Sequence, residues 1–213
     1  MIRRRRDGQR GQGVVEFALL VPVFMLILLA MLEFGFLFDH TLTIQYASRE
    51  GARVGSALVN GGGTLGCPSS STVSPNAATV DPLIIAAVTR VLKSPGSRVD
   101  IARVPTIRIY KAGATGNELG PVNVWTYSAG ATAVVDGVTL TLNYAYSSTL
   151  SPNPWAACIR SNGGVSPDSI GVSLTYTYQF QTALGNVLRF FGGSGFSTVA
   201  VSDRTVMAMN PSN

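Results

Sequence analysis

A long run of apolar positions near the start of the chain is its clearest feature. Residues 17–32 are all apolar, and residues 34–38 add a second apolar run after Glu33. Together with two valines before Glu16, the stretch reaches about 25 residues, and a membrane-spanning helix needs about 20. A cleavable secretory signal normally has a shorter apolar core of about 7–15 residues and a small-x-small cleavage site. Residues 33–38 (EFGFLF) offer no such site, so the pattern predicts a retained transmembrane helix.

Helical character is expected to continue beyond the membrane. Residues 41–59 contain no proline, and Ala47, Gly51 and Gly55 recur at every fourth position. Because glycine inside a helix costs about 1 kcal/mol relative to alanine, this spacing predicts a face that another backbone approaches closely. A frayed helix end is the alternative. Pro22 lies inside the apolar segment, where lipid-embedded helices tolerate proline, and it predicts a bend.

The remaining pattern predicts an α+β domain with a second helix packed on an antiparallel sheet. Residues 60–76 have a loop composition, and a helix is expected over 81–94, with Asp81 as its N-cap and Pro82 at its first position. Apolar and polar residues then alternate, which is typical of strands. Asp136-Gly137 marks a hairpin turn. The expected strands cover residues 104–111, 122–127, 132–135, 138–144, 170–180 and 197–209, with a short helix over 183–191.

Charge is concentrated at the N-terminus. The first eleven residues hold five arginines and Asp7, which supply +4 of the net charge of +5. Basic residues beside a membrane helix place that end in the cytoplasm. The nearly neutral remainder offers no basic face for nucleic acid, so no nucleic-acid partner is expected. These features predict a cytoplasmic leader over 1–11, a helix over 12–59 and an extracytoplasmic domain over 60–213 of a single-pass protein in the cell membrane.

Candidate chemistry in the predicted domain is sparse. Cys67 and Cys158 can form a disulfide in an oxidising compartment, with two separate buried thiols as the alternative. The one histidine, His40, follows the apolar segment and is expected to be an interfacial polar residue. Asp168 and Asp203 could bind Ca²⁺ only if folding joins them. Aromatic residues at alternate strand positions are expected in the core, with surface adhesion as the alternative. No catalytic or phosphate-binding motif is present, so we expect no enzyme, no cofactor and no metal site.

The residues that enter the apolar helix form a specific pattern. Arg10-Gly11 is followed by Gln12, and Glu16-Phe17 begin the helix. A carboxylate near a membrane helix is costly and therefore a functional candidate. The pattern resembles the prepilin-peptidase motif of type IV-type pilins, in which cleavage follows glycine and glutamate is fifth in the mature chain. Only a cut after Gly11 places Glu16 fifth, since the neighbouring glycines would place it eighth or third.

Two further stretches resemble TadE-like proteins, the minor pilins or pseudopilins of tight-adherence pili. These are residues 33–35 (EFG) and 47–53 (ASREGAR), and the resemblance is strong over residues 8–56. A weaker similarity to actinobacterial TadE-like proteins covers residues 160–162, 167–172 and 202–207. The short leader with four consecutive arginines departs from the family pattern.

The resemblance implies a pilin-like subunit that is matured by prepilin peptidase and helps to assemble a tight-adherence pilus. Its partners would be the membrane, other pilins or pseudopilins, and the pilus assembly platform, and incorporation into the pilus is a further location. The new amine of Gln12 would pair with Glu16 of a neighbouring subunit. Glu33 would act similarly near the outer leaflet, or be held there by solvent. The alternative function is an envelope-anchored binding module that uses an uncleaved helix as a tether.

Overall fold

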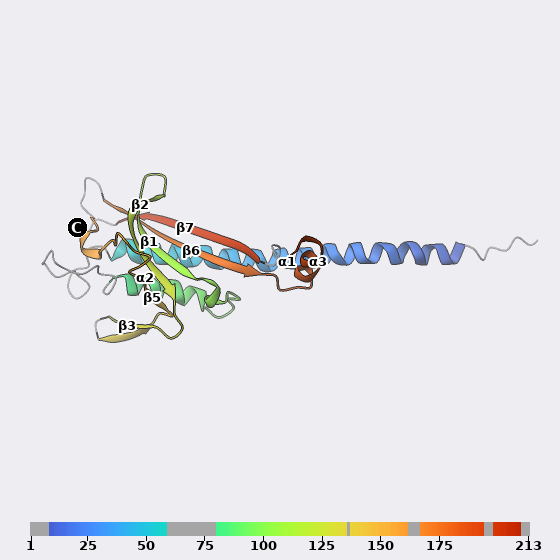
Figure 1. The fold of residues 1–213 in the computed structure, drawn as a ribbon, viewed down its shortest axis with the longest axis horizontal. Helices are drawn as coiled ribbons and strands as arrows, with labels where there is room; N and C mark the ends of the chain where they lie inside the picture. The colour runs from blue at the N-terminus through green and yellow to red at the C-terminus, as the bar shows by residue number, and fades with distance from the viewer. Residues whose placement is uncertain (1–8, 59–79, 136, 162–166, 194–197, 210–213) are drawn as a thin grey trace, which may run out of the picture. The chain divides into compact units, whose positions relative to one another are not determined.

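The computed structural model describes residues 9–58, 80–135, 137–161, 167–193 and 198–209 (Figure 1). The chain divides into two compact units. The first comprises Met1–Phe38 and Gln179–Val199, and the second comprises Asp39–Tyr178 and Ala200–Asn213. Cys67 lies outside the described residues, as does the side chain of Cys158. The disulfide therefore stays a prediction.

Helix α1 (Gln9–Ala57) begins within the predicted leader and ends two residues before the predicted boundary. It continues through Pro22, where the bend stays a prediction. Within the described part of the chain, it is the one helix that is long and apolar enough to cross a membrane. The long apolar helix expected from the sequence is therefore confirmed.

The second unit contains a five-stranded sheet with the order β5-β2-β1-β6-β7. The central strand β1 pairs antiparallel with both β2 and β6, so that Ile107 lies opposite Trp125 on one side and Leu174 on the other. Helix α2 (Asp81–Leu92) supplies the second layer, which confirms the predicted α+β class. The strands are β1 (Thr106–Ala112), β2 (Glu118–Tyr127), β3 (Thr132–Val135), β4 (Val138–Thr141), β5 (Tyr144–Tyr146), β6 (Ser169–Gln179) and β7 (Thr198–Ala208). The short 3-10 helices are η2 (Ile101–Arg103) and η3 (Ala157–Ile159).

The predicted hairpin is present, but its second strand is shorter than expected. Strand β3 pairs with β4, and Gly137 adopts a positive φ of 76° in the turn, while Asp136 lies outside the described residues. The predicted strand over 138–144 breaks because Asn143 takes a left-handed backbone conformation with φ of 58°. After this break the chain enters β5, which pairs with β2 instead.

The small-residue face of α1 packs against its own domain. A Cβ atom added to Gly51 would lie 2.6 Å from Val88 Cγ2 and 3.2 Å from Val172 Cγ1, so both α2 and β6 contact the helix there. Gly55 has the same relation to Ile170, and Ala47 is fully buried. Side chains of the domain make this close approach, and not the backbone that the spacing predicted. The helix is continuous through both glycines to Ala57.

Aromatic side chains form much of the core, as the strand pattern predicted. Rings from β2 and β5 meet edge to face, with centroids 6.0 Å apart for Trp125–Tyr146 and 5.9 Å apart for Tyr127–Tyr144. Burial raises the pKa of Tyr144, which donates a hydrogen bond to the carbonyl oxygen of Val104. The largest buried aromatic side chains are Tyr110, Trp125, Tyr144, Trp155, Tyr176 and Tyr178.

The predicted capping role of Asp81 is wrong. The N-cap of α2 is Val80, and no side chain caps the helix. Asp81 is instead fully buried, and its carboxylate accepts hydrogen bonds of 2.6 Å each from Arg160 Nη2 and Asn123 Nδ2. Pro82 lies in the first turn, but at its second position and not at the predicted first, because the helix begins one residue earlier at Asp81. Asp81 therefore links α2 to β2 and to the segment after η3.

Candidate functional site

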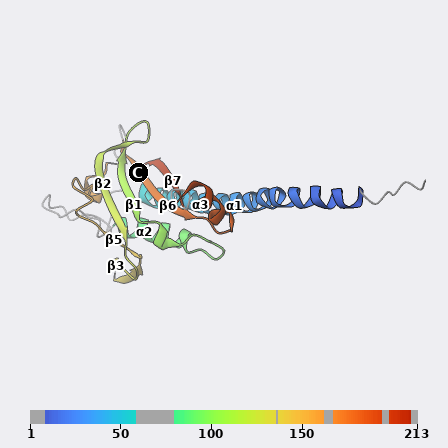
Figure 2. The same ribbon diagram turned by 45° about the vertical axis from the view of Figure 1, so that its right-hand side comes forward.

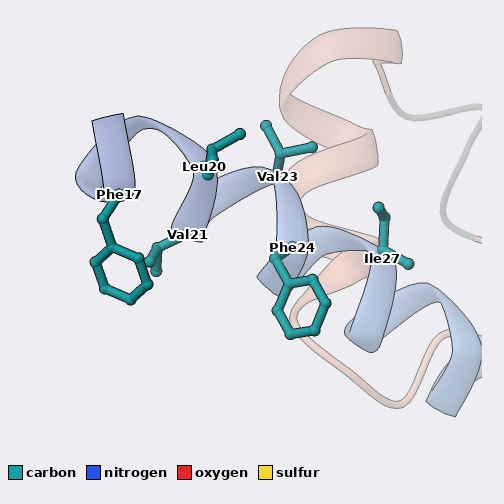
Figure 3. A pocket seen from close by; sticks show the side chains of 6 residues that line it. All are labelled: Phe17, Leu20, Val21, Val23, Phe24 and Ile27. Carbon is teal, nitrogen blue, oxygen red and sulfur yellow. The ribbon is translucent and has the colours of Figure 1, made fainter. Parts of the chain in front are cut away.

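The first unit exposes a continuous apolar surface on α1. Six side chains at positions 17, 20, 21, 23, 24 and 27 line a shallow recess, and Figure 3 shows them projecting from one stretch of the helix. Residues three or four apart lie on the same side of a helix, so Phe17, Leu20, Phe24 and Ile27 follow one stripe. All four are exposed. We call the six residues the α1 apolar face. Such a face needs lipid or another apolar helix against it.

Glu16 lies at the N-terminal end of this face. It is exposed, and its Oε1 atom accepts a hydrogen bond of 3.0 Å from Nε2 of Gln12. The predicted cleavage bond between Gly11 and Gln12 lies inside α1, and both residues are exposed. Apart from the neighbouring backbone of the helix itself, no atom lies within 4 Å of a Cβ built on Gly11 or Gly13. Gln12 and Glu16 thus contact each other within one helix through the side-chain amide of Gln12, whereas the predicted pairing joins the freed backbone amine of Gln12 to Glu16 of a neighbouring subunit.

Glu33 lies at the other end of the apolar segment and is buried, with 3% of its surface exposed. Its Oε1 accepts a hydrogen bond of 2.8 Å from the amide of Gln181. Its Oε2 accepts bonds of 2.9 and 2.6 Å from the amide and hydroxyl of Thr182. The alternative of a carboxylate held by solvent is wrong. Its own chain supplies three donors, from a segment that sequence reasoning had not connected with Glu33.

His40 is also buried, which corrects its assignment as an interfacial residue. Its Nδ1 lies 2.8 Å from the hydroxyl oxygen of Tyr176, and its ring meets that of Tyr178 edge to face at 5.1 Å between centroids. Burial is the main cause that raises the pKa of Tyr176. His40 therefore fastens α1 to β6 within the second unit.

Two motif regions far apart in the sequence meet in the second unit. Ser48 of α1 donates a hydrogen bond to the carboxylate of Asp203 on β7, and its hydroxyl lies 2.8 Å from that of Thr205. One helical turn on, Arg53 pairs with Glu50 at 2.6 Å, and this hydrogen bond lowers the pKa of Glu50. Ser48 thus attaches α1 to β7, whereas Glu50 and Arg53 pair with each other on the surface of the helix.

The two aspartates considered for Ca²⁺ have separate partners. Asp168 pairs with Lys111 at 2.7 Å and accepts a hydrogen bond from the amide of Ser161, whereas Asp203 binds Ser48. Across the described ranges, no group of three or more histidine, cysteine, aspartate or glutamate side chains could hold a metal ion.

Comparison with known proteins finds a family match within the α1 region. Residues 11–53 match the family model of TadE-like protein. No curated protein and no solved structure matches the chain. The resemblance to TadE-like proteins is thus confirmed over residues 11–53, the stretch that carries the α1 apolar face, Glu16 and Glu33.

Proposed function

We propose that this chain is a minor pilin or pseudopilin that acts without catalysis in the assembly of a tight-adherence pilus. In this proposal α1 spans the cell membrane with its N-terminus in the cytoplasm, and the second unit is extracytoplasmic. Prepilin peptidase hydrolyses the bond between Gly11 and Gln12. The mature subunit then packs its α1 apolar face against the N-terminal helices of other subunits at the assembly platform.

The observation that carries the proposal is the exposed α1 apolar face within the residues that match the TadE-like family. The helix that follows Phe38 packs into a folded domain through its small residues, but Phe17 to Ile27 present large exposed apolar side chains. A helix used only as a tether needs hydrophobicity alone. A recess between aromatic and branched side chains also provides the shape into which a neighbouring helix can pack.

Local structure favours cleavage at the predicted bond. Gly11 and Gly13 flank Gln12, and each glycine weakens a helix by about 1 kcal/mol relative to alanine. The start of α1 can therefore unwind, which a protease needs for access to the backbone. Hydrolysis leaves the carboxylate on Gly11 and a new amine on Gln12. That amine starts a helix whose fifth residue is Glu16.

The leader also explains the proposed orientation. Five arginines and one aspartate give it a charge of +4, which opposes its passage across the membrane and keeps it in the cytoplasm. Cleavage removes this charge together with the leader. The Gln12 amine is then the cation nearest to Glu16 along the mature helix.

The proposal is tested by the intact mass of the membrane-extracted protein, made with and without the host's prepilin peptidase. We expect a peptidase-dependent chain that begins at Gln12. Mass spectrometry is the suitable readout, because an N-terminal glutamine can cyclise and block Edman degradation. A Gly11→Val variant should stay uncut, while Gly13→Ala, which keeps Gly11 in place, should still be cut. If the wild-type chain keeps its arginines in both hosts, the processed-pilin proposal is wrong and an uncleaved tether is favoured.

A further inference from the structure

The connection between β6 and β7 belongs to the same unit as the apolar part of α1. Residues Gln179–Val199 group with Met1–Phe38, and α3 (Leu184–Gly192) lies against α1 in both ribbon views (Figures 1 and 2). Glu33 holds the start of this connection through Gln181 and Thr182. A helix beside the membrane-spanning part of α1 must itself meet the membrane.

The level of this contact follows from the length of α1. A hydrocarbon core of about 30 Å corresponds to about 20 residues at about 1.5 Å per residue. If the span starts near Val14, the first apolar residue after the leader, it ends near Glu33. Glu33 and the residues that it binds therefore lie at the outer boundary of the hydrocarbon.

The backbone at the start of α3 is suited to that boundary. In lipid, every amide group needs a partner within the protein, because no water is available to supply one. The carboxylate of Glu33 accepts hydrogen bonds from two of these amides, those of Gln181 and Thr182, and from the hydroxyl of Thr182. The hydroxyl and carbonyl oxygens of Thr182 accept hydrogen bonds from the amides of Leu184 and Gly185, respectively. The carbonyl oxygen of Ala183 accepts hydrogen bonds from the amides of Asn186 and Val187. Six amide groups of this segment are thus paired, two of them by a carboxylate that comes from α1.

The side chains of α3 divide into an apolar and a polar set. Leu184, Val187 and Leu188 are half-buried, and Phe190 is 83% exposed, the largest exposed fraction among the large apolar residues described. The polar residues instead gather with the preceding loop around one shallow hollow. Its lining consists of Gln179, Gln181, Thr182, Asn186 and Arg189, together with Phe180, Ala183 and Gly185. Apolar residues on one side and an arginine on the other are typical of a helix that lies in the membrane interface.

We propose that residues 179–193 form an interfacial segment that enters the outer leaflet of the membrane crossed by α1. Phe190 contacts the acyl chains, Arg189 reaches the headgroup phosphates, and Glu33 is the internal acceptor that allows the loop to lie at this level. In this proposal Glu33 stabilises the loop of its own chain at the membrane boundary. Lipid, and not protein, contacts the exposed side chain of Phe190.

Tryptophan fluorescence in vesicles tests this placement in the full-length protein. A Phe190→Trp variant is reconstituted in phosphatidylcholine vesicles with and without lipids brominated on their acyl chains. The native tryptophans, Trp125 and Trp155, are buried in the second unit and give a constant background that is subtracted. We expect the added emission to be blue-shifted, to lose most of its intensity in brominated lipid, and to resist acrylamide in the aqueous phase.

Two reference variants define the limits of this measurement. Leu28→Trp probes an exposed position in the apolar part of α1, and Leu119→Trp probes an exposed position on β2. The first should be quenched by brominated lipid and the second by acrylamide. If Phe190→Trp behaves like Leu119→Trp, the interfacial segment does not exist. If neither quencher reaches position 190, protein covers it, for example a second copy of the chain, and the lipid proposal is equally overturned.

The role of Glu33 is tested on the same background. Glu33→Gln, combined with Phe190→Trp, removes the charge and one acceptor oxygen, and we expect acrylamide to gain access to position 190. Asp39→Asn, at an exposed carboxylate on the same helix, is the matched control and should change nothing. Unchanged protection in Glu33→Gln would show that Glu33 does not hold the segment. The lipid proposal rests on the membrane span and not on cleavage, so the mass of the mature chain decides the proposed function separately.

Discussion

At the scale of single residues, Asp81 and Arg160 form a fully buried ion pair in the second unit. Their side chains are 0% and 1% exposed, and Arg160 Nη2 lies 2.6 Å from Asp81 Oδ1. The same Nη2 donates to the carbonyl oxygen of Trp155, and the guanidinium lies 4.8 Å from the centroid of the Trp155 ring. Because removal of one partner leaves an unpaired charge in a medium of low polarity, each residue is needed once the other is present.

We therefore expect Arg160→Met to lower the free energy of unfolding of the second unit by about 3–5 kcal/mol. Arg108→Met is the matched control, because its ion pair with Glu118 at 2.7 Å is solvent-exposed and should contribute about 0–1 kcal/mol. Urea unfolding of the full chain in detergent, followed by tryptophan fluorescence, measures both. Equal losses for the two variants would contradict the special role of the buried pair.

Residue roles were the part of the structure that the sequence predicted least well. Asp81 was assigned to a cap, His40 to an interface and Glu33 to solvent or another subunit. The partners that decide their roles lie 79, 136 and 148 residues away. A local sequence pattern can indicate that burial of a charged residue would cost free energy. It cannot indicate which residue, distant in the sequence, donates the hydrogen bond that offsets this cost. Gln12 and Glu16 do lie within one turn of the same helix, but the predicted pairing of the Gln12 amine with Glu16 of a neighbouring subunit stays a prediction.

At the scale of elements, hydrophobic periodicity was sufficient to predict most helices and strands. The long helix, α2, α3 and most of the alternating strands appear near their predicted bounds, although β2 begins four residues earlier than expected. The strand order β5-β2-β1-β6-β7 was not predictable, because it depends on pairing between strands distant in sequence. The break between β4 and β5 was missed as well, since it depends on the left-handed conformation of one residue, Asn143.

The close packing of α1 on its domain can be tested at Gly51. Alanine favours a helix by about 1 kcal/mol over glycine, but its Cβ would lie 2.6 Å from Val88 Cγ2. Because overpacking of a core costs about 1–3 kcal/mol, we expect Gly51→Ala to lower the urea midpoint of the full chain. Gly35→Ala, where no atom lies within 4 Å of the added Cβ, should not lower it. A higher midpoint for Gly51→Ala would show that the packing can relax without cost.

At the scale of the whole molecule, α1 belongs to both units and carries a different surface in each. Its N-terminal part presents large exposed apolar residues, and its C-terminal part buries small residues in the folded domain. The match to TadE-like protein covers residues 11–53 and therefore both surfaces. In the proposed function, this one continuous helix joins a packing surface for other helices to a domain outside the membrane. Assembly would then depend on charges near the start of that helix, where the α1 apolar face begins.

Glu16 is the residue that tests this dependence. The carboxylate is exposed and accepts a hydrogen bond from the neutral side-chain amide of Gln12, one helical turn earlier. It can therefore still pair with a cation from another subunit. We expect Glu16→Gln to be processed normally but to lose most of its incorporation into isolated pili, measured by immunoblot of sheared pilus fractions. Glu50→Gln is the control, because Glu50 already pairs with Arg53 on its own helix and should not affect incorporation. Normal incorporation of Glu16→Gln would rule out charge pairing between subunits. Loss in both variants would indicate a general defect of α1 and not a specific role of Glu16.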